Sequence, residues 1–156
     1  MLASRQRKLP TRVIDVSSAA LSSGTVRLYE PSGAVAEYIA LSHTWGKSPR
    51  LRALRENIPA LLAGIPVADL PKTFQDAIIL TLNLGIQYLW IDCLCIIQDD
   101  PHDWEQQAAT MSTVYRDAYL TISASASSDS TSGCFPARGR HSYASPAERS
   151  MALCPH

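Results

Sequence analysis

The sequence predicts an α/β fold, in which a mostly parallel sheet is flanked by helices. From residue 37 onward, strand-like and helix-like patterns alternate in the order β, irregular helix, helix, β, helix, β, which is typical of crossover connections between parallel strands. Residues 87–92 carry apolar side chains on both faces of a strand, as expected where helices cover both sides of a parallel sheet. The length of 156 residues suits one domain with a hydrophobic core.

Three β-prone segments come first along the chain. Residues 11–16 (TRVIDV) and 25–30 (TVRLYE) are rich in β-branched and aromatic residues, and a turn-rich stretch separates them. Residues 37–42 (EYIALS) are a stronger strand candidate, which runs directly into a polar loop. We therefore expect two short strands before the alternating part of the fold and one longer strand that begins it.

The next two segments have helical spacing of different clarity. Residues 51–69 match a helix only in part, because Pro59 and Gly64 interrupt the pattern. A helix that begins near Pro71 is clear, since apolar residues recur at i, i+4, i+7 and i+8 and Gly85 stands where a helix would end. The residues of this apolar face are Leu70, Phe74, Ala77 and Ile78.

The last part of the pattern is strand, helix, strand. Residues 87–92 (QYLWID) predict a strand, and Asp103 is a suitable N-cap for a helix from about Trp104 to Asp117. Residues 118–124 (AYLTISA) predict the final strand. The inner stripe expected for the helix consists of Trp104, Ala108, Met111 and Tyr115.

The composition is that of a globular protein without a charge bias. Apolar residues make up 46% of the chain, and 14 Lys and Arg balance 14 Asp and Glu, so net charge does not favour a nucleic-acid or anionic-membrane partner. No apolar run approaches the ~18 residues of a membrane span, and we find no secretory signal. The four cysteines are few and irregularly spaced, which favours a reducing, cytoplasmic setting.

Polar residues gather where two of the predicted strands end. In open α/β sheets, ligands bind in the crevice beyond the carboxyl ends of the strands. If the strands at 37–42 and 87–92 are neighbours, the residues that leave them meet at one rim with the first turn of the following helix. These residues are Ser42, His43, Trp45 and Gly46 after the first strand, Asp92 at the exit of the second, and Glu105 in the helix.

Each of these residues also has a structural explanation. Asp92 can accept backbone N–H bonds or cap a turn, and Glu105 in a first helical turn favours the helix dipole by its charge alone. His43 can be a structural histidine, and Trp45 and Trp90 can be core residues. The pattern of residues alone leaves both readings open.

The cysteine pair and the glycines do not predict a further site. On a strand, the thiols of Cys93 and Cys95 would point to the same face, but no second pair with ligand spacing accompanies them, so we expect no metal site. Cys93 also lacks a base that the sequence makes visible, which disfavours a nucleophilic role. No G-x-G-x-x-G run is present, so a dinucleotide-binding dehydrogenase site and a bound cofactor are not predicted.

Three blocks of the sequence resemble the heterokaryon-incompatibility (HET) domain family. EYIALSHTWG resembles its opening block Y-x-A-L-S-Y-x-W-G, and LPKTFQDAIILTLNLGIQYLWIDCLCIIQDDPHDW contains its W-I-D-x-L-C-I-x-Q core. EQQAATMSTVYRDAYLTISASASSDSTSGCF is similar to its third block, including the M-x-x-x-Y pair. LPTRVIDV and VRLYE are similar to the preamble often seen before it. The resemblance covers about residues 9–135, with 1–8 expected to be a flexible basic tail and 136–156 an irregular one.

The resemblance implies a fold and a function. HET domains are found mainly in filamentous fungi, where they trigger programmed cell death after non-self recognition, often as one module of a larger signalling protein. They are thought to resemble the Toll/interleukin receptor (TIR) domain, which has a flavodoxin-like α/β fold. Some TIR domains self-associate and cleave NAD with a glutamate. The resemblance therefore implies NAD as a substrate, Glu105 as the catalytic carboxylate, and Ser42, His43, Trp45, Gly46 and Asp92 as residues around the nucleotide.

Two departures from the family pattern leave alternatives open. His43 stands where tyrosine is commoner and Thr44 precedes Trp45, so a role carried over to position 43 is in doubt. After Phe135 the sequence has no periodic apolar pattern, and a sheet left incomplete at the C-terminus would expose an edge. The alternatives to a NAD-cleaving enzyme are a non-catalytic TIR-like interaction module and a truncated, inactive relative.

Overall fold

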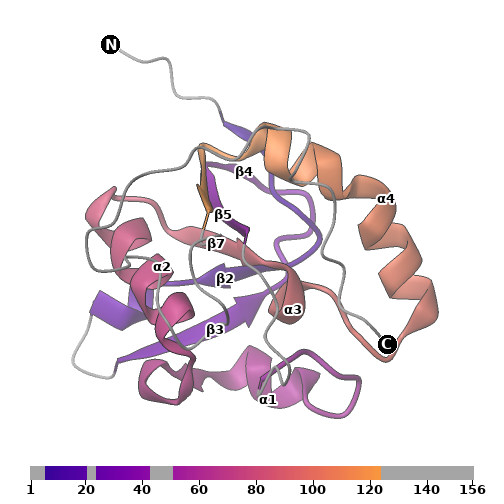
Figure 1. Cartoon of the computed structure of the whole chain (residues 1–156), viewed down its shortest axis with the longest axis horizontal. Helices are drawn as coiled ribbons and strands as arrows, with labels where there is room; N and C mark the ends of the chain where they lie inside the picture. The colour runs from indigo at the N-terminus through magenta and orange to yellow at the C-terminus, as the bar shows by residue number, and fades with distance from the viewer. Residues whose placement is uncertain (1–5, 21–23, 43–50, 124–156) are drawn as a thin grey trace.

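The computed structural model describes residues 6–20, 24–42 and 51–123. Six strands form its central sheet: β2 (Val13–Asp15), β3 (Thr25–Tyr29), β5 (Tyr38–Ser42), β6 (Ile65–Pro66), β7 (Tyr88–Ile91) and β8 (Leu120–Ser123). Its helices are α1 (Ile58–Ala63), α2 (Lys72–Asn83), α3 (Asp92–Cys95) and α4 (Pro101–Asp117), with 3₁₀ turns η1 (Ser17–Ala20) and η2 (Val67–Asp69). The short strands β1 (Arg7–Lys8) and β4 (Val35–Ala36) form a separate antiparallel ribbon. The prediction of an α/β fold with helices flanking a sheet is confirmed (Figure 1).

The sheet is mixed rather than mostly parallel. Its strand order is β6-β3-β2-β7-β5-β8. The strands β7, β5 and β8 are parallel, whereas β2 runs antiparallel to both β7 and β3, and β3 runs antiparallel to β6. The helical alternation that predicted parallel strands begins only at residue 37. The connection from β2 to β3 is too short for the crossover that a parallel pair requires, so this half of the sheet is antiparallel.

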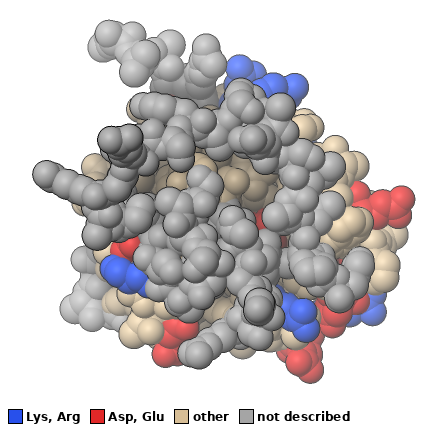
Figure 2. All heavy atoms as spheres, viewed as in Figure 1, with Lys and Arg blue, Asp and Glu red and all other residues tan. Residues whose placement is uncertain are grey.

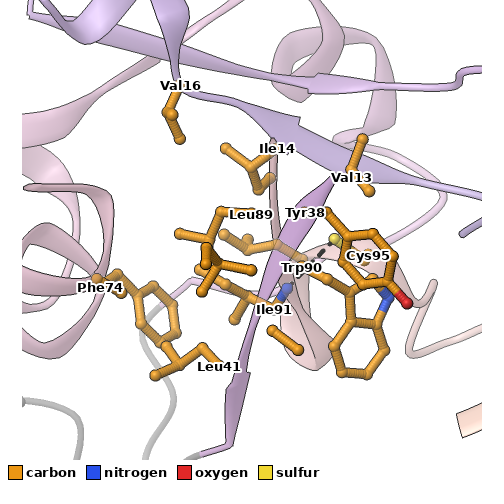
Figure 3. Close-up of a cluster of buried hydrophobic side chains, with 14 of the residues drawn as sticks. Val13, Ile14, Val16, Tyr38, Leu41, Phe74, Leu89, Trp90, Ile91 and Cys95 are labelled. Atoms are coloured by element: carbon orange, nitrogen blue, oxygen red, sulfur yellow. Dashed lines mark hydrogen bonds between the residues drawn. The ribbon is translucent and has the colours of Figure 1, made fainter. Parts of the chain in front are cut away.

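Helices α2 and α4 cover opposite faces of the parallel strands (Figure 1). Ile39 and Leu41 of β5 lie beside Leu89 and Ile91 of β7 in register, and these fully buried side chains face α2, where Phe74 points toward Leu41 (Figure 3). On the other face, the Tyr38 hydroxyl donates to the Val114 carbonyl of α4 at 2.5 Å. The Trp90 ring meets the Tyr115 ring edge to face, with 5.4 Å between centroids. The strands β5 and β7 are thus buried on both sides, as the apolar sequence of residues 87–92 predicted for β7.

Helix α2 agrees closely with the sequence prediction. It begins immediately after Pro71 and ends before Gly85, which has a left-handed φ of 72°. The Gly85 N–H donates to the Leu82 carbonyl and the Ile86 N–H donates to the Thr81 carbonyl, the two bonds of a Schellman ending. Ile86 is buried, which adds the apolar contact usual for this motif.

Helix α4 begins three residues earlier than the prediction, which was wrong about its cap. Asp100 is the N-cap, and its side chain accepts from the backbone N–H groups of His102 and Asp103. Pro101 occupies the first helical position, where its fixed φ suits a helix and its missing N–H is not needed. Asp103 lies inside the first turn and is buried, so its carboxylate does not act as the N-cap of the helix.

The segment after β7 also differs from the prediction. The strand ends at Ile91, and Asp92, Cys93, Leu94 and Cys95 form the single helical turn α3. The expectation that both thiols lie on one face of a strand is therefore wrong. Both cysteines are completely buried, and burial raises the pKa of the Cys95 thiol to about 12. A thiol that remains protonated at neutral pH is a weak nucleophile.

The two residues expected to interrupt a helix instead mark the limits of α1. Pro59 lies in its first turn, and Gly64 ends it with a positive φ of 156°. The ambiguous stretch at 51–69 thus resolves into a short helix, the two-residue strand β6 and a 3₁₀ turn.

The described surface shows charges of both signs and no membrane element. In the view of Figure 2, the basic and acidic side chains that are visible are interspersed around the edge, without a large patch of one sign. None of the helices within the described ranges is long and apolar enough to cross a bilayer.

Candidate functional site

The three parallel strands define where a ligand site is expected. In chain order they are β5, β7 and β8, and in the sheet β5 lies between the other two. The chain therefore reverses its direction of winding at β5, and α/β sheets bind ligands beyond the carboxyl ends of the strands at such a switch point. Ser42 ends β5 and Ser123 ends β8, and they are paired in register, so their side chains lie on the same face of the sheet.

A tyrosine from α4 joins this rim to the end of β7. Tyr115 is hydrogen-bonded to the side chain of Ser42 and lies close enough to Asp92 to feel its charge. Burial, and secondarily the negative charge of Asp92, raises the pKa of Tyr115 well above its ordinary value, while the bond with Ser42 lowers it. Tyr115 is therefore protonated at neutral pH. We call Ser42, Asp92 and Tyr115 the rim cluster.

Asp92 is held firmly in this position. It is 7% exposed, and its Oδ1 accepts from the Cys93 N–H at 2.8 Å. Its carbonyl accepts from the Ile96 N–H at 3.0 Å and from the Gln98 side chain at 3.3 Å. The backbone-accepting role considered for this residue is thus present, and it fixes the carboxylate at the exit of β7, beside Tyr115. A charge follows a core strand here because the strand ends one residue before it.

Glu105 lies apart from the rim cluster. It is exposed on α4, and since successive helical residues turn by about 100°, it projects about 200° away from Asp103. Along the helix axis it is about 15 Å from Tyr115, although the tyrosine side chain leans back toward the helix N-terminus. Within the described ranges, no hydrogen bond or ion pair joins Glu105 to Ser42 or Asp92. Its catalytic role stays a prediction.

The other predicted site residues, His43, Trp45 and Gly46, lie outside the described residues. Conversely, Tyr115 entered the sequence analysis as part of the inner stripe of its helix and as the tyrosine of the M-x-x-x-Y pair, but not as a site residue. A tyrosine that is largely enclosed usually finds a hydrogen-bond partner for its hydroxyl, and this tendency could have indicated a role at the site. Its partner, Ser42, is distant in sequence, so local pattern could not identify the pair.

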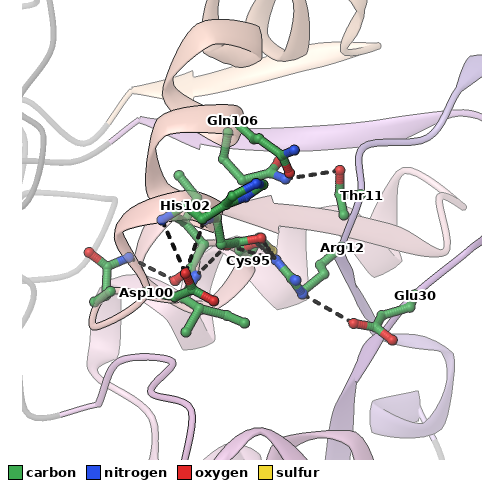
Figure 4. A network of polar contacts seen from close by, with 12 residues as sticks. Thr11, Arg12, Glu30, Cys95, Asp100, His102 and Gln106 are labelled. Carbon is green, nitrogen blue, oxygen red and sulfur yellow. Dashed lines mark hydrogen bonds and ion pairs between the residues drawn. The ribbon is translucent and has the colours of Figure 1, made fainter.

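A buried ion pair positions the helix that carries Tyr115 (Figure 4). The Arg12 Nη1 contacts both carboxylate oxygens of Asp103 at 3.0 Å and also donates to the Cys95 carbonyl at 3.3 Å. Its Nε donates to Glu30 at 3.2 Å. Asp103 additionally accepts from the Ile97 N–H at 2.9 Å. This contact between the residue before β2 and the start of α4 explains why Asp103 is buried, and it ties the N-terminal strands to the helix that carries Tyr115.

The chemistry available at the rim is that of hydroxyls and carboxylates. Across residues 6–20, 24–42 and 51–123, no three His, Cys, Asp or Glu side chains are grouped as metal ligands would be. Cys93 and Cys95 are both enclosed in the core, and Figure 3 shows Cys95 among the buried apolar side chains. Hydrogen bonding to a polar organic ligand is what this arrangement can offer.

Comparison with known proteins gives one match. No curated protein and no solved structure is similar enough to be matched to this chain. Residues 38–153 match the protein family described as "Heterokaryon incompatibility protein (HET)". The match begins at β5 and includes both strands and the helix that form the rim cluster. Because it covers well over half of the 156 residues, the chain belongs to the heterokaryon incompatibility family.

Proposed function

We propose that this chain is a heterokaryon-incompatibility effector domain that promotes programmed cell death by cleaving NAD when it self-associates. The family match supports a role of the heterokaryon-incompatibility type. NAD cleavage is proposed on the resemblance to TIR domains. The fungal setting and joint action with other signalling domains are proposed on the resemblance to the HET family, and the cytoplasmic setting on the few, irregularly spaced cysteines.

The observation that carries this proposal is the order of the parallel strands. The order β7-β5-β8, numbered by position in the chain, is 2-1-3, which is how a flavodoxin-like sheet begins. In such sheets a nucleotide binds beside the first strand, at its carboxyl end. Ser42 and Asp92 stand at that end here, where Tyr115 is hydrogen-bonded to Ser42 and lies within the influence of the Asp92 charge. This supports the expected TIR-like fold and a nucleotide at the rim.

The proposed reaction breaks the bond between nicotinamide and ribose. The electron pair leaves with nicotinamide, C1′ of the ribose becomes an oxocarbenium-like centre, and water adds to it and loses a proton to give ADP-ribose. A carboxylate near the ribose stabilises the developing positive charge, as in glycoside hydrolysis. Glu105 is proposed for this role, and nicotinamide leaves without strong acid catalysis. Ser42, His43, Gly46 and Asp92 are proposed to surround the nucleotide, with Trp45 stacking on a ring.

The test is NAD consumption by purified protein, both dilute and fused to an oligomerising domain. The Glu105→Gln variant removes the proposed catalytic charge, and Glu56→Gln is a matched control because Glu56 is also an exposed glutamate of a surface segment. We expect turnover in the clustered wild type and in Glu56→Gln, and a loss of at least 100-fold in Glu105→Gln, in line with the loss of a charge-stabilising group. Circular dichroism checks that all three are folded.

One observation favours a second candidate, a non-catalytic interaction module. Glu105 is exposed and is not joined to the rim cluster. If folded, clustered wild-type protein leaves NAD intact, or if Glu105→Gln turns over NAD like the wild type, the catalytic assignment is wrong. In the first of these cases, the interaction module is the better description.

A further inference from the structure

We propose that the hydroxyl groups of Ser42 and Tyr115, together with the Asp92 carboxylate, hold the ribose diol that carries nicotinamide, with Tyr115 as a positioning residue. The ligand class rests on the proposed function, since it takes NAD as the nucleotide. The hydrogen-bonding site itself rests on the positions of Ser42, Asp92 and Tyr115 and can be tested by binding alone.

The tyrosine ring is fixed before any ligand arrives. Its edge-to-face contact with Trp90, which is 1% exposed, sets the plane of the ring, and the bond with Ser42 sets the position of the hydroxyl. The ion pair between Arg12 and Asp103 fixes the start of the same helix. A hydroxyl held in this way loses little freedom on binding, which is the advantage of a preorganised contact.

The two hydroxyls can bind a ligand in addition to each other. Tyr115 and Ser42 are joined by a side-chain hydrogen bond, and a tyrosine or serine hydroxyl can both donate and accept. One bond between the two hydroxyls therefore leaves each of them with further hydrogen-bonding capacity. The partly buried phenol of Tyr115 has a raised pKa and keeps its proton at neutral pH, so the pair offers both a donor and an acceptor to a ligand at the rim.

The charge at the rim selects the kind of ligand group. The Asp92 carboxylate only accepts hydrogen bonds, and each of its oxygens accepts more than one. It would repel a phosphate but accept from the hydroxyls of a sugar, as an acidic residue does with ribose in dinucleotide-binding sheets. A vicinal diol offers both a donor for Asp92 and an oxygen for Tyr115, so a ribose fits this combination better than a phosphate does.

Tyr115→Phe tests the proposal because it removes the hydroxyl and keeps the ring against Trp90. Tyr38→Phe is the matched control: the Tyr38 hydroxyl also forms a hydrogen bond between β5 and α4, but Tyr38 stands at the opposite end of β5 and donates to the Val114 carbonyl. The probe is ADP-ribose, measured by isothermal titration calorimetry, with ADP as the comparison that lacks the second ribose. Ser42→Ala gives an independent loss of the same contact.

We expect Tyr115→Phe and Ser42→Ala to weaken ADP-ribose binding about tenfold, as the loss of one hydrogen bond does, without changing ADP binding, and Tyr38→Phe to bind both like the wild type. The proposal is overturned if the wild type does not bind ADP-ribose, if Tyr115→Phe binds it unchanged, or if both ligands weaken equally. The expected pattern without NAD turnover would reject cleavage and keep the ribose site. If the wild type cleaves NAD but Tyr115→Phe binds ADP-ribose unchanged, the ribose site is rejected and cleavage is kept.

Discussion

Arg12 is the residue whose loss should damage the fold most. Its side chain is 10% exposed and pairs with an equally buried Asp103, and a buried charge left without its partner is strongly unfavourable. We expect Arg12→Met to lower the free energy of unfolding by about 3–5 kcal/mol, measured by urea denaturation. Arg27→Met is the control, because Arg27 is half exposed and its partner Asp15 keeps other donors. That variant should lose less than about 1 kcal/mol, and equal losses would contradict this argument.

Asp15 should make stability depend on pH in the acid range. Burial raises the pKa of its carboxyl, but hydrogen bonds from Ser17 and Gln87 outweigh burial, and the pKa lies below its ordinary value. The unfolded chain therefore binds the proton first as the pH falls. The stability that Asp15 contributes is present above about pH 4 and is lost as the pH falls through the lower folded pKa.

Asp15→Asn provides the measurement for this pH effect. The difference in unfolding free energy between the wild type and Asp15→Asn should be largest near neutral pH and shrink in acid, in urea titrations from pH 7 down to pH 3. A difference that stays constant over this range would show that Asp15 does not carry the effect.

At the scale of an element, the end of α2 depends on a single glycine. Gly85 has a φ of 72°, and a Cβ placed there would meet no atom within 4 Å, so the cost of a substitution comes from the backbone alone. We expect Gly85→Ala to destabilise the protein by about 1–2 kcal/mol, the penalty of a left-handed residue with a Cβ. Gly85→Asn should cost less, because asparagine tolerates this conformation. Equal thermal midpoints for the two variants would argue against the backbone explanation.

Sequence patterns predicted those elements that local residues determine. The strands β5, β7 and β8 and the helix α2 were found because their apolar spacing and their prolines and glycines act within one segment. The turn α3 was not found, since four residues inside an apolar run are too few to show a helical period. At α4, both Asp100 and Asp103 suit an N-cap. A partner 91 residues away, Arg12, draws Asp103 into the core, and no local pattern contains that contact.

At the scale of the whole molecule, the site too combines features that local residues determine with contacts between residues far apart in the sequence. The sequence placed Ser42 and Asp92 at neighbouring strand ends, and the parallel register of β5 and β7 agrees with this. It did not assign Tyr115 to the site, because the contact of this residue with Ser42 arises only when α4 packs across the sheet. It also did not predict that the N-terminal strands extend the same sheet, because hydrophobic spacing alone does not specify which strands pair.

The N-terminal strands lead to the last prediction, that the family-matched region does not fold alone. The match begins at residue 38, yet β2 pairs with β7 in the middle of the sheet, and Arg12 holds the start of α4. Leu9, Val13, Ile14, Val16, Val26 and Leu28 are all at most 4% exposed.

Each such side chain contributes about 1.5–3 kcal/mol by burial, and together they rival the ~5–15 kcal/mol stability of a whole domain. A chain beginning at residue 37 should therefore lack a cooperative urea transition and should bind the dye ANS through its exposed core. Supplying residues 1–36 as a separate peptide should restore the transition in part. A shortened chain that unfolds cooperatively at the wild-type midpoint would show that β2 and β3 are dispensable additions to the sheet.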